Sequence, residues 1–379
     1  MIRCRLCVMP NTRPDTPFVD GICAACIAYA KRPTINWAER LEQFDQLLRR
    51  LGENGSGYDC IVPSSGGKDS HYQVLKIIEM GWRPLLVTAS TCHLTHYGRQ
   101  NIDNLARLAT TIEVTPNRTV RAKLNRLGLE MVGDVSWPEH VSIFTTPFRV
   151  AADMGIPLLF YGENPQNQYG GPAGSEEARQ LTRRWRSEFG GFLGLRPADM
   201  VGQLGITERD MTDYAMPEPK INWAAGTGQP HDEIEAHFLG QYFPWDSHLN
   251  AAAAFADGMH QSLPSPANYW RHENLDNAQT GLHDHMMYRK YGYGRGCAQI
   301  SVDVRAGRQT RAYAMDWVRE FDGLFPYTYA GVNAKTMLAR IDLSMGKLVP
   351  LLAKFTNKAL FKDEKDLRPI PLEWDEQAA

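Results

Sequence analysis

Patterns typical of buried strands and of helices alternate along residues 58–164, and this alternation restricts the fold more than any other feature of the sequence. Short apolar runs indicate four strands, and the segments between them have helical patterns. The expected strands are 58–63, 84–90, 111–115 and 157–161, and the expected helices are 69–80, 99–109, 118–132 and 140–154. This order predicts an α/β fold with a doubly wound parallel sheet. Ligands of such sheets bind beyond the carboxyl ends of the strands, so the candidate site follows the strand ends.

A glycine-containing turn, Ser65-Gly66-Gly67-Lys68-Asp69-Ser70, follows the first expected strand and leads into a helix. Glycines allow backbone N–H groups to approach an anion closely, and the helix N-terminus adds partial positive charge. The carboxylate of Asp69 would repel phosphates unless a divalent cation such as Mg²⁺ lies beside it. The loop is not a Walker A motif, because Val62 occupies the place of its first glycine. The sequence therefore predicts a phosphate site of another kind, and the alternative is a tight turn with a capping aspartate.

Two Cys-x2-Cys pairs near the start of the chain predict a metal site. Cys4 and Cys7 form the first pair, and Cys23 and Cys26 form the second. Four thiolates at this spacing favour a tetrahedral Zn²⁺ site with a structural role, because no coordination position stays open. Disulfides and an iron–sulfur cluster are the alternatives, and a cytoplasmic location disfavours disulfides. The remaining cysteines are expected to be buried apolar residues: Cys60, Cys92 and Cys297.

The chain divides into three expected regions. Residues 1–36 form a zinc-knuckle module, 37–172 form the α/β domain, and 173–379 form a mainly helical region for binding a substrate or partner. One further helix is expected at 37–51, before the first strand. In the third region, where the alternation fades, the helical segments are 175–189, 250–258, 283–291, 309–322 and 345–361.

Charge and hydropathy exclude several classes of protein. The chain has 41 Lys and Arg residues against 43 Asp and Glu residues, so its net charge is −2 and no strongly basic nucleic-acid surface is expected. No uncharged apolar run reaches the ~18 residues that a membrane-spanning helix needs. The first residues lack the apolar segment of a secretory signal. We therefore expect a cytoplasmic protein with no membrane insertion and no nucleic-acid partner.

The segment SGGKDS after a buried strand resembles the pyrophosphate loop (PP-loop) of the ATP-pyrophosphatase superfamily, which includes GMP synthetase, asparagine synthetase and tRNA thiolases. Residues 58–164 match that domain in order and spacing. The resemblance implies that ATP is cleaved between its α and β phosphates and that AMP is transferred to a carbonyl oxygen of the substrate. An amine, ammonia or sulfur then displaces the adenylated oxygen.

A narrower resemblance covers nearly the whole chain and is carried by the cysteine pairs, the glycine loop and four further segments. These segments are Tyr58-Asp59-Cys60, Tyr161-Gly162-Glu163-Asn164, Tyr242-Phe243-Pro244-Trp245-Asp246 and Lys290-Tyr291-Gly292-Tyr293-Gly294-Arg295. They look like the N-acetyl sugar amidotransferases of bacterial lipopolysaccharide O-antigen and surface-sugar pathways. The resemblance implies conversion of an acetamido group on a sugar, or nucleotide sugar, into an acetamidino group. It also implies that a glutaminase subunit, resembling the histidine-pathway amidotransferase and cyclase pair, supplies ammonia. Where the family usually has more acidic residues, this chain has Gly296-Cys297-Ala298-Gln299.

This chemistry assigns roles to candidate residues, with ATP, Mg²⁺ and Zn²⁺ as the expected cofactors. The ATP-binding candidates are Ser65, Gly66, Gly67, Lys68, Asp69, Ser70, Thr88, Ser90 and Gly162. The catalytic candidates are Lys68, Asp69, Glu163, Lys290 and Arg295, with Asp69 as the magnesium ligand. The substrate-binding candidates are Asn164, Tyr242, Trp245 and Asp246. The alternatives are a solvated Lys68, a simple turn around Glu163 and a packed aromatic turn at 242–246.

Two rival functions remain open. A tRNA thiolase also joins a zinc module to SGGKDS, but it generally needs a further CxxC or a cysteine pair near the ATP site, and Cys60, Cys92 and Cys297 form no CxxC. A non-enzymatic adenine-nucleotide sensor is the second rival, and pyrophosphate release that depends on substrate and ammonia separates it from the enzyme. For His93 and His96 a structural or substrate-contact role is favoured over metal binding, and His283-Asp284-His285 is interpreted as a polar helix start. No glutaminase signature is evident, so use of glutamine is expected to require the partner subunit.

Overall fold

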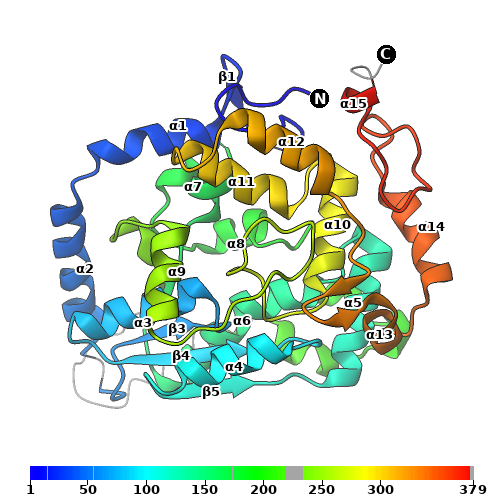
Figure 1. The fold of residues 1–379 in the computed structure, drawn as a ribbon. Coiled ribbons are helices and arrows are strands. Elements are labelled where there is room, and N and C mark those ends of the chain that lie inside the picture. Colours follow the sequence, from blue (N-terminus) through cyan, green and yellow to red (C-terminus); the bar gives the residue numbers. More distant parts are fainter. Residues whose placement is uncertain (15, 54, 173, 218–233, 376–379) are drawn as a thin grey trace.

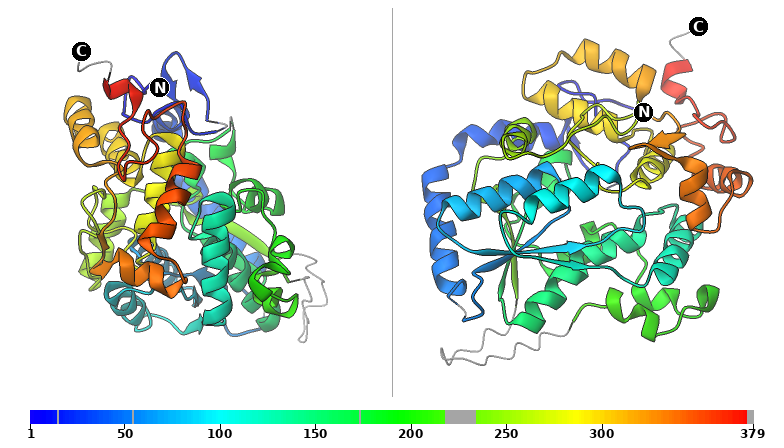
Figure 2. Two further views of the ribbon diagram at one scale, coloured as in Figure 1. Left: turned by 90° about the vertical axis from the view of Figure 1, so that its right-hand side faces the viewer. Right: turned by 60° about the horizontal axis from the view of Figure 1, so that its bottom comes forward.

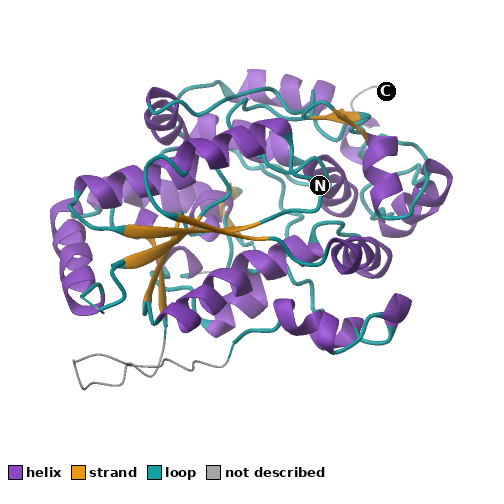
Figure 3. Cartoon of the chain, turned by 90° about the horizontal axis from the view of Figure 1, so that it is seen from below, coloured by secondary structure: helices purple, strands orange, loops and turns teal. Residues whose placement is uncertain are grey.

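A five-stranded parallel sheet forms the centre of the computed structural model, which describes residues 1–14, 16–53, 55–172, 174–217 and 234–375. The strand order is β5-β4-β3-β6-β7, and every pair is parallel. Figures 1 and 3 show the twisted sheet between layers of helices. The strands are β3 (Cys60–Pro63), β4 (Pro84–Ala89), β5 (Thr111–Val114), β6 (Leu158–Tyr161) and β7 (Glu235–Phe238). The predicted α/β architecture with a parallel sheet is confirmed.

Alternate residues of the strands face two separate cores, which explains why the strands are apolar on both faces. In β4, Leu86 packs with α2 (Trp37–Leu51) and α3 (Lys68–Glu79), whereas Leu85 and Val87 pack with α6 (Trp137–Met154). Helix α4 (His96–Leu105) joins the first layer. Helix α5 (Arg118–Val132), at the predicted bounds, packs against α6.

Strand β7 differs from the prediction, in which the alternation of strand and helix patterns fades beyond residue 172. It pairs with β6 along its whole length, from Leu158 opposite Glu235 to Tyr161 opposite Phe238. Its sequence, Glu-Ala-His-Phe, is too short and too polar to be recognised as a buried strand. The polar residues are instead stabilised by partners: Glu235 accepts hydrogen bonds from Arg50, on α2, and lies 3.0 Å from Nε2 of His237.

The region after β6 is mainly helical, as predicted, with shifted boundaries. The helix predicted over 175–189 is interrupted: a 3₁₀ turn covers Ser175–Glu177, and helix α8 starts only at Arg183. The α-helices of this region are α7 (Pro165–Tyr169), α8 (Arg183–Phe189), α9 (Ser247–Ala256), α10 (Thr280–Tyr291), α11 (Arg295–Arg305), α12 (Arg311–Phe321), α13 (Ala334–Arg340), α14 (Met345–Phe355) and α15 (Leu372–Asp375). A hairpin with a two-residue turn pairs β8 (Thr328–Tyr329) with β9 (Val332–Asn333). Within the described ranges, no helix combines the length and apolar composition needed to cross a bilayer.

The N-terminal segment packs against the far end of the chain. It contains the small hairpin β1 (Phe18–Val19) and β2 (Ile22–Cys23) and the helix α1 (Ala24–Lys31). One core cluster joins Val8 of this segment to Ile300 on α11 and to the helix α12. Figures 1 and 2 show the N-terminal segment beside α11 and α12.

Candidate functional site

The glycine loop connects the end of β3 to the first turn of α3. Gly67 is the N-cap of α3, and no side chain caps this helix end, so its first N–H groups are available to a ligand. Gly66 has a φ of +83°, and a Cβ there would come within 2.8 Å of the backbone nitrogen of Ile102. The backbone N–H of Ser65 donates to Oγ of Ser70 over 3.2 Å. The predicted glycine turn at the start of a helix is therefore present, and that helix end is uncapped.

A pocket of about 140 Å³ opens over this loop. Its lining combines the loop with the start of α4 and with residues 272–276, far along the chain. The side-chain nitrogen Nε2 of His272 and Oγ1 of Thr88 are buried and make no hydrogen bond within the described residues. The lining residues are Ser65, Gly66, Gly67, Lys68, Asp69, Ser70, Gly98, Asn101, Met259, His272, Glu273, Asn274, Leu275 and Asp276.

Ion pairs connect the loop to Glu273 in the lining of the pocket. The buried ammonium of Lys68 lies 2.8 Å from Oδ2 of Asp69 and 3.1 Å from Oε1 of Glu273. Asn250, on α9, donates to Oδ1 of Asp69 over 3.1 Å, and Gln299, on α11, donates to Oε2 of Glu273 over 2.7 Å. Lys68 is therefore not solvated, whereas one third of the Asp69 side chain remains exposed.

Electrostatics divide the carboxyl groups of this cluster into two kinds. Burial opposes ionisation of Glu273, but the charges of Lys68 and Arg295 and the hydrogen bond from Gln299 outweigh it and lower its pKa to about 2. Burial and the neighbouring carboxylate of Asp69 raise the pKa of Glu163 well above its usual value, with Lys68 opposing them. Burial likewise opposes the charge of Lys68, but Asp69 and Glu273 reverse this effect and raise its pKa. These surroundings thus favour the ionised form of Glu273 and the protonated form of Glu163.

Glu163 also lines a second pocket of about 50 Å³. With its amide turned to satisfy both neighbours, Gln168 donates to the Glu163 carboxyl group and accepts from Oγ of Ser247. Three hydrogen-bond donors in the lining of this pocket are buried and unpartnered within the described residues: Nε1 of Trp245, Nη1 of Arg40 and Nη1 of Arg305. Buried donors without acceptors favour a ligand rich in oxygen.

The predicted substrate-binding residues lie at or near this second pocket, but several also have structural roles. Asn164 caps α7 by accepting from Gln166, and Asp246 caps α9 while pairing with Arg308 over 2.8 Å. The Tyr242 hydroxyl lies 2.7 Å from Nδ1 of His237, inside the aromatic core, as the packed-turn alternative expects. The residues of the set that line the pocket are Asn164, Trp245 and Asp246.

Gly162 and Ser90 have neighbours that explain them without a nucleotide. A Cβ on Gly162 would lie 2.8 Å from Nε2 of Gln73 and 3.2 Å from the ring of Trp245, so a larger residue would have to displace these side chains. The hydroxyl of Ser90 donates to Glu113 over 2.8 Å. Neither residue lines the loop pocket, and Thr88, the other ATP-binding candidate, does not line it either.

The two cations predicted near residues 290–295 occupy different surroundings. The ammonium of Lys290 donates to the backbone carbonyl of Val132, and Lys290 does not line the loop pocket. Arg295 lies 3.0 Å from Asp284, and its charge contributes to the low pKa of Glu273. The structure therefore brings Arg295, but not Lys290, to the ionised cluster.

Sequence reasoning missed Glu273 and Gln299, which complete this cluster. Oε1 of Gln299 accepts from the backbone N–H groups of Tyr269 and Trp270, while its amide nitrogen holds Glu273. Gln299 belongs to the segment in which the chain departs from the acidic family pattern. Residues 268–274 have no strand or helix pattern, so only the density of polar residues in this segment could have indicated a site.

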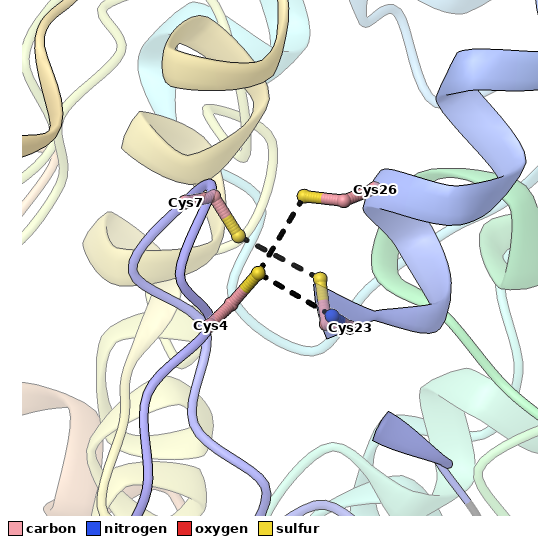
Figure 4. A group of neighbouring side chains, drawn as sticks. All are labelled: Cys4, Cys7, Cys23 and Cys26. Atoms are coloured by element: carbon pink, nitrogen blue, oxygen red, sulfur yellow. Dashed lines mark hydrogen bonds between the residues drawn. The ribbon is translucent and has the colours of Figure 1, made fainter. Parts of the chain in front are cut away.

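The four cysteines of the two pairs converge into one cluster. Their Sγ atoms all lie within 4.8 Å of one another, with 3.8 Å between Cys4 and Cys26 and 3.6 Å between Cys7 and Cys23. Figure 4 shows the sulfur atoms pointing toward a common centre. A tetrahedral ion with Zn–S bonds of about 2.3 Å separates its sulfurs by about 3.8 Å, so the cluster fits zinc. All seven cysteines are free thiols.

Comparisons with known proteins gave one match over the C-terminal region and one over 110 residues. Residues 264–375 match a family model described as LPS biosynthesis protein WbpG-like, C-terminal domain. An uncharacterized protein of Methanocaldococcus jannaschii is 26% identical over 110 residues, which are 28% of this chain and 39% of that protein. The chain thus spans well under half the length of this curated relative. The family match points to lipopolysaccharide biosynthesis, and neither comparison supports a tRNA thiolase.

The residues that match the family model lie partly at the site. The match includes Glu273, which pairs with the loop lysine, and Gln299 and Arg295, which act on Glu273; it also includes the helices against which the cysteine cluster packs. The region similar to lipopolysaccharide biosynthesis proteins therefore forms one wall of the glycine-loop pocket.

Replacing Glu163 by glutamine is expected to raise the melting temperature at about pH 8 and to change it little at about pH 4. The raised pKa of Glu163 means that the folded protein retains a proton which the unfolded chain releases above the ordinary value of 4.5. The free energy of unfolding therefore falls as the pH rises through and above 4.5, because the unfolded chain releases this proton more readily. Glutamine cannot ionise and removes this effect. Thermal unfolding should show a difference of a few degrees, on the order expected for a single buried group.

The matched control is Glu177→Gln, because the side chain of Glu177 is 73% exposed. Its melting temperature should follow that of the unaltered protein throughout. A Glu163→Gln effect of the same size at every pH would show that folding does not raise the pKa of Glu163.

Proposed function

We propose that the chain is an ATP-dependent amidotransferase that converts the acetamido group of an N-acetylated, nucleotide-linked sugar into an acetamidino group. AMP is attached to the acetamido oxygen and pyrophosphate leaves. Ammonia adds to the resulting O-adenyl imidate, and AMP departs with the former acetamido oxygen. The product would serve lipopolysaccharide O-antigen or related surface-glycan biosynthesis.

One observation carries this proposal. An uncapped glycine loop of the kind that binds phosphates shares its pocket with residues 272–276, which belong to the segment similar to lipopolysaccharide biosynthesis proteins. The glycine loop and the segment similar to lipopolysaccharide biosynthesis proteins thus meet at the ion pair between Lys68 and Glu273. This combination supports activation of a sugar substrate by a nucleotide more than it supports a nucleotide sensor.

The loop residues have separate tasks in this reaction. The backbone N–H groups at the start of α3 would hold phosphate oxygens, and the buried Lys68 would offset the charge of the departing pyrophosphate. The partly exposed carboxylate of Asp69 would hold Mg²⁺, which supplies positive charge to the phosphate oxygens when bound. Glu273 and Asn250 fix the positions of Lys68 and Asp69 before the substrate arrives.

Glu163 joins the two pockets in this scheme. It lines the second pocket, and its pKa responds to Asp69 of the first. A carboxyl group that keeps its proton can donate a hydrogen bond to an oxygen or imine nitrogen of the substrate. The unpartnered donors of Arg40 and Trp245 would bind hydroxyl or phosphate oxygens of the sugar nucleotide.

The test of the proposed function is AMP and pyrophosphate formation from ATP and Mg²⁺ with candidate nucleotide sugars. Both products should require an N-acetylated sugar and ammonium together. A sugar that carries a free amine in place of the acetamido group should give neither, because it has no carbonyl oxygen to adenylate. ATP cleavage to ADP, or equal AMP formation without the sugar, would contradict the proposal.

The purified chain is expected to use ammonium, and to do so faster as the pH rises, because only unprotonated ammonia is a nucleophile. Glutamine should not replace ammonium unless a glutaminase subunit is added. Amidine formation measured by mass spectrometry over a series of pH values, with each nitrogen source, checks both statements. Glutamine hydrolysis by the chain alone would refute the division of labour between two subunits.

A further inference from the structure

A second cluster of metal-ligand side chains lies outside both pockets. It consists of Asp134, in the turn between α5 and α6, His140 on α6 and His283 on α10. Nδ1 of His283 lies 2.8 Å from Oδ1 of Asp134, and Nδ1 of His140 lies 3.3 Å from Oδ2. His283 is thus more than the polar start of a helix: it connects the family-matched region to the α/β domain.

The ligand atoms have the spacing of a metal site. All three lie within 4.8 Å of one another. An ion with bonds of about 2.0–2.2 Å to nitrogen and oxygen in tetrahedral geometry separates its ligand atoms by about 3.3–3.5 Å. The observed distances of 2.8 and 3.3 Å require only a small outward shift of one imidazole.

Hydrogen bonding in the cluster leaves one ligand nitrogen unsatisfied. Nδ1 of His140 is buried and makes no hydrogen bond of acceptable geometry within the described residues, although it faces Oδ2 of Asp134. The other carboxylate oxygen, Oδ1, accepts from the backbone N–H of Ser136 over 2.8 Å. This contact orients the carboxylate from outside, as hydrogen bonds to metal ligands commonly do.

The exposure of the three side chains would allow an ion to enter. The Asp134 side chain is 5% exposed, whereas those of His140 and His283 are 25% and 21% exposed. The nearby ammonium of Lys290 donates to the carbonyl of Val132 and forms no ion pair with Asp134. Three protein ligands leave one of the four tetrahedral positions for water or a ligand.

We propose that Asp134, His140 and His283 bind a divalent transition ion of the zinc type, separate from the cysteine cluster. Two imidazoles and a carboxylate are ligands that zinc accepts, and hard ions such as Mg²⁺ prefer oxygen alone. The bound ion would join α6 to α10 and so fix the family-matched region against the α/β domain. This site does not depend on the proposed reaction.

Zinc binding by the full chain tests this proposal. After equilibration with zinc and removal of the free ion, elemental analysis should find about two ions per chain, one at each site. His140→Ala and His283→Ala should each reduce the content to about one ion and weaken the second zinc-binding step by at least about tenfold. In cobalt-loaded protein, these variants should lose d–d absorption from a nitrogen and oxygen site and retain the thiolate charge-transfer bands of the cysteine cluster.

The matched control is His96→Ala, since His96 is an exposed histidine outside the cluster. It should retain both ions. Circular dichroism identifies any variant that fails to fold, and His283→Gln then replaces it, because glutamine keeps the polarity of the position. One zinc in the unaltered protein, or two in the folded His140 and His283 variants, would show that the cluster is an ion pair only and would overturn the proposal.

Discussion

Replacing Asp69 by alanine or asparagine is expected to reduce AMP formation by about 10³-fold, a loss typical of removing one preorganised charge-stabilising group. Asp69 is the one carboxylate of the glycine loop, and its side chain is one-third exposed in the loop pocket. Because it belongs to no apolar core, its loss should leave the fold intact. Asparagine keeps the shape and the contact with Asn250 but removes the charge that would hold Mg²⁺.

The control for this experiment is Asp103→Asn on α4. Asp103 is 64% exposed and pairs with Arg99 on its own helix. Its variant should retain full activity. AMP formation by the folded Asp69→Asn protein at the rate of the control would remove the metal-binding role from Asp69.

Replacing Cys23 by serine is expected to abolish tightly held zinc at the cysteine cluster and to lower the melting temperature by about 5 °C or more. Cys23 lies 3.6 Å from Cys7, and its backbone N–H donates to Sγ of Cys4 over 3.3 Å. The cluster packs against Ile300 and Val318, so the loss should extend into α11 and α12. Metal analysis after chelator treatment and thermal unfolding measure the two effects.

The matched control is Cys92→Ser. Cys92 lies outside the cluster and is only partly buried. Its variant should retain the zinc and unfold near the temperature of the unaltered protein. Unchanged stability of Cys23→Ser, or a cysteine cluster that binds no zinc, would contradict a structural metal site.

The strands that could be predicted from the sequence are mainly the apolar ones. The strands β3, β4 and β6 are mainly apolar because helices cover both faces, and the edge strand β5 was recognised although it contains Thr111 and Glu113. Strand β7 has Glu235 and His237 in a four-residue segment; these two side chains contact each other, and Glu235 also pairs with Arg50. Such compensation depends on contacts between distant segments, which no local pattern reveals.

The same limit applies to the site. The glycine loop was recognisable because its residues are consecutive and their geometry is local. The partner of Lys68 was not, because Glu273 lies 205 positions away in a segment without regular structure. Gly162 shows the opposite case. It was predicted to bind the nucleotide, but its place in the sequence is explained by packing, since a Cβ there would come too close to Gln73 and Trp245.

The most direct test of the central claim follows the acetamido oxygen. A nucleotide sugar labelled with ¹⁸O in the acetyl carbonyl is incubated with the chain, ATP, Mg²⁺ and ¹⁵N-ammonium. The account predicts that the ¹⁸O appears in the phosphate of AMP and that the sugar gains one ¹⁵N in its place, because AMP leaves with the oxygen to which it was attached. Unlabelled AMP, or a sugar that retains its ¹⁸O, would contradict adenylation of the acetamido group.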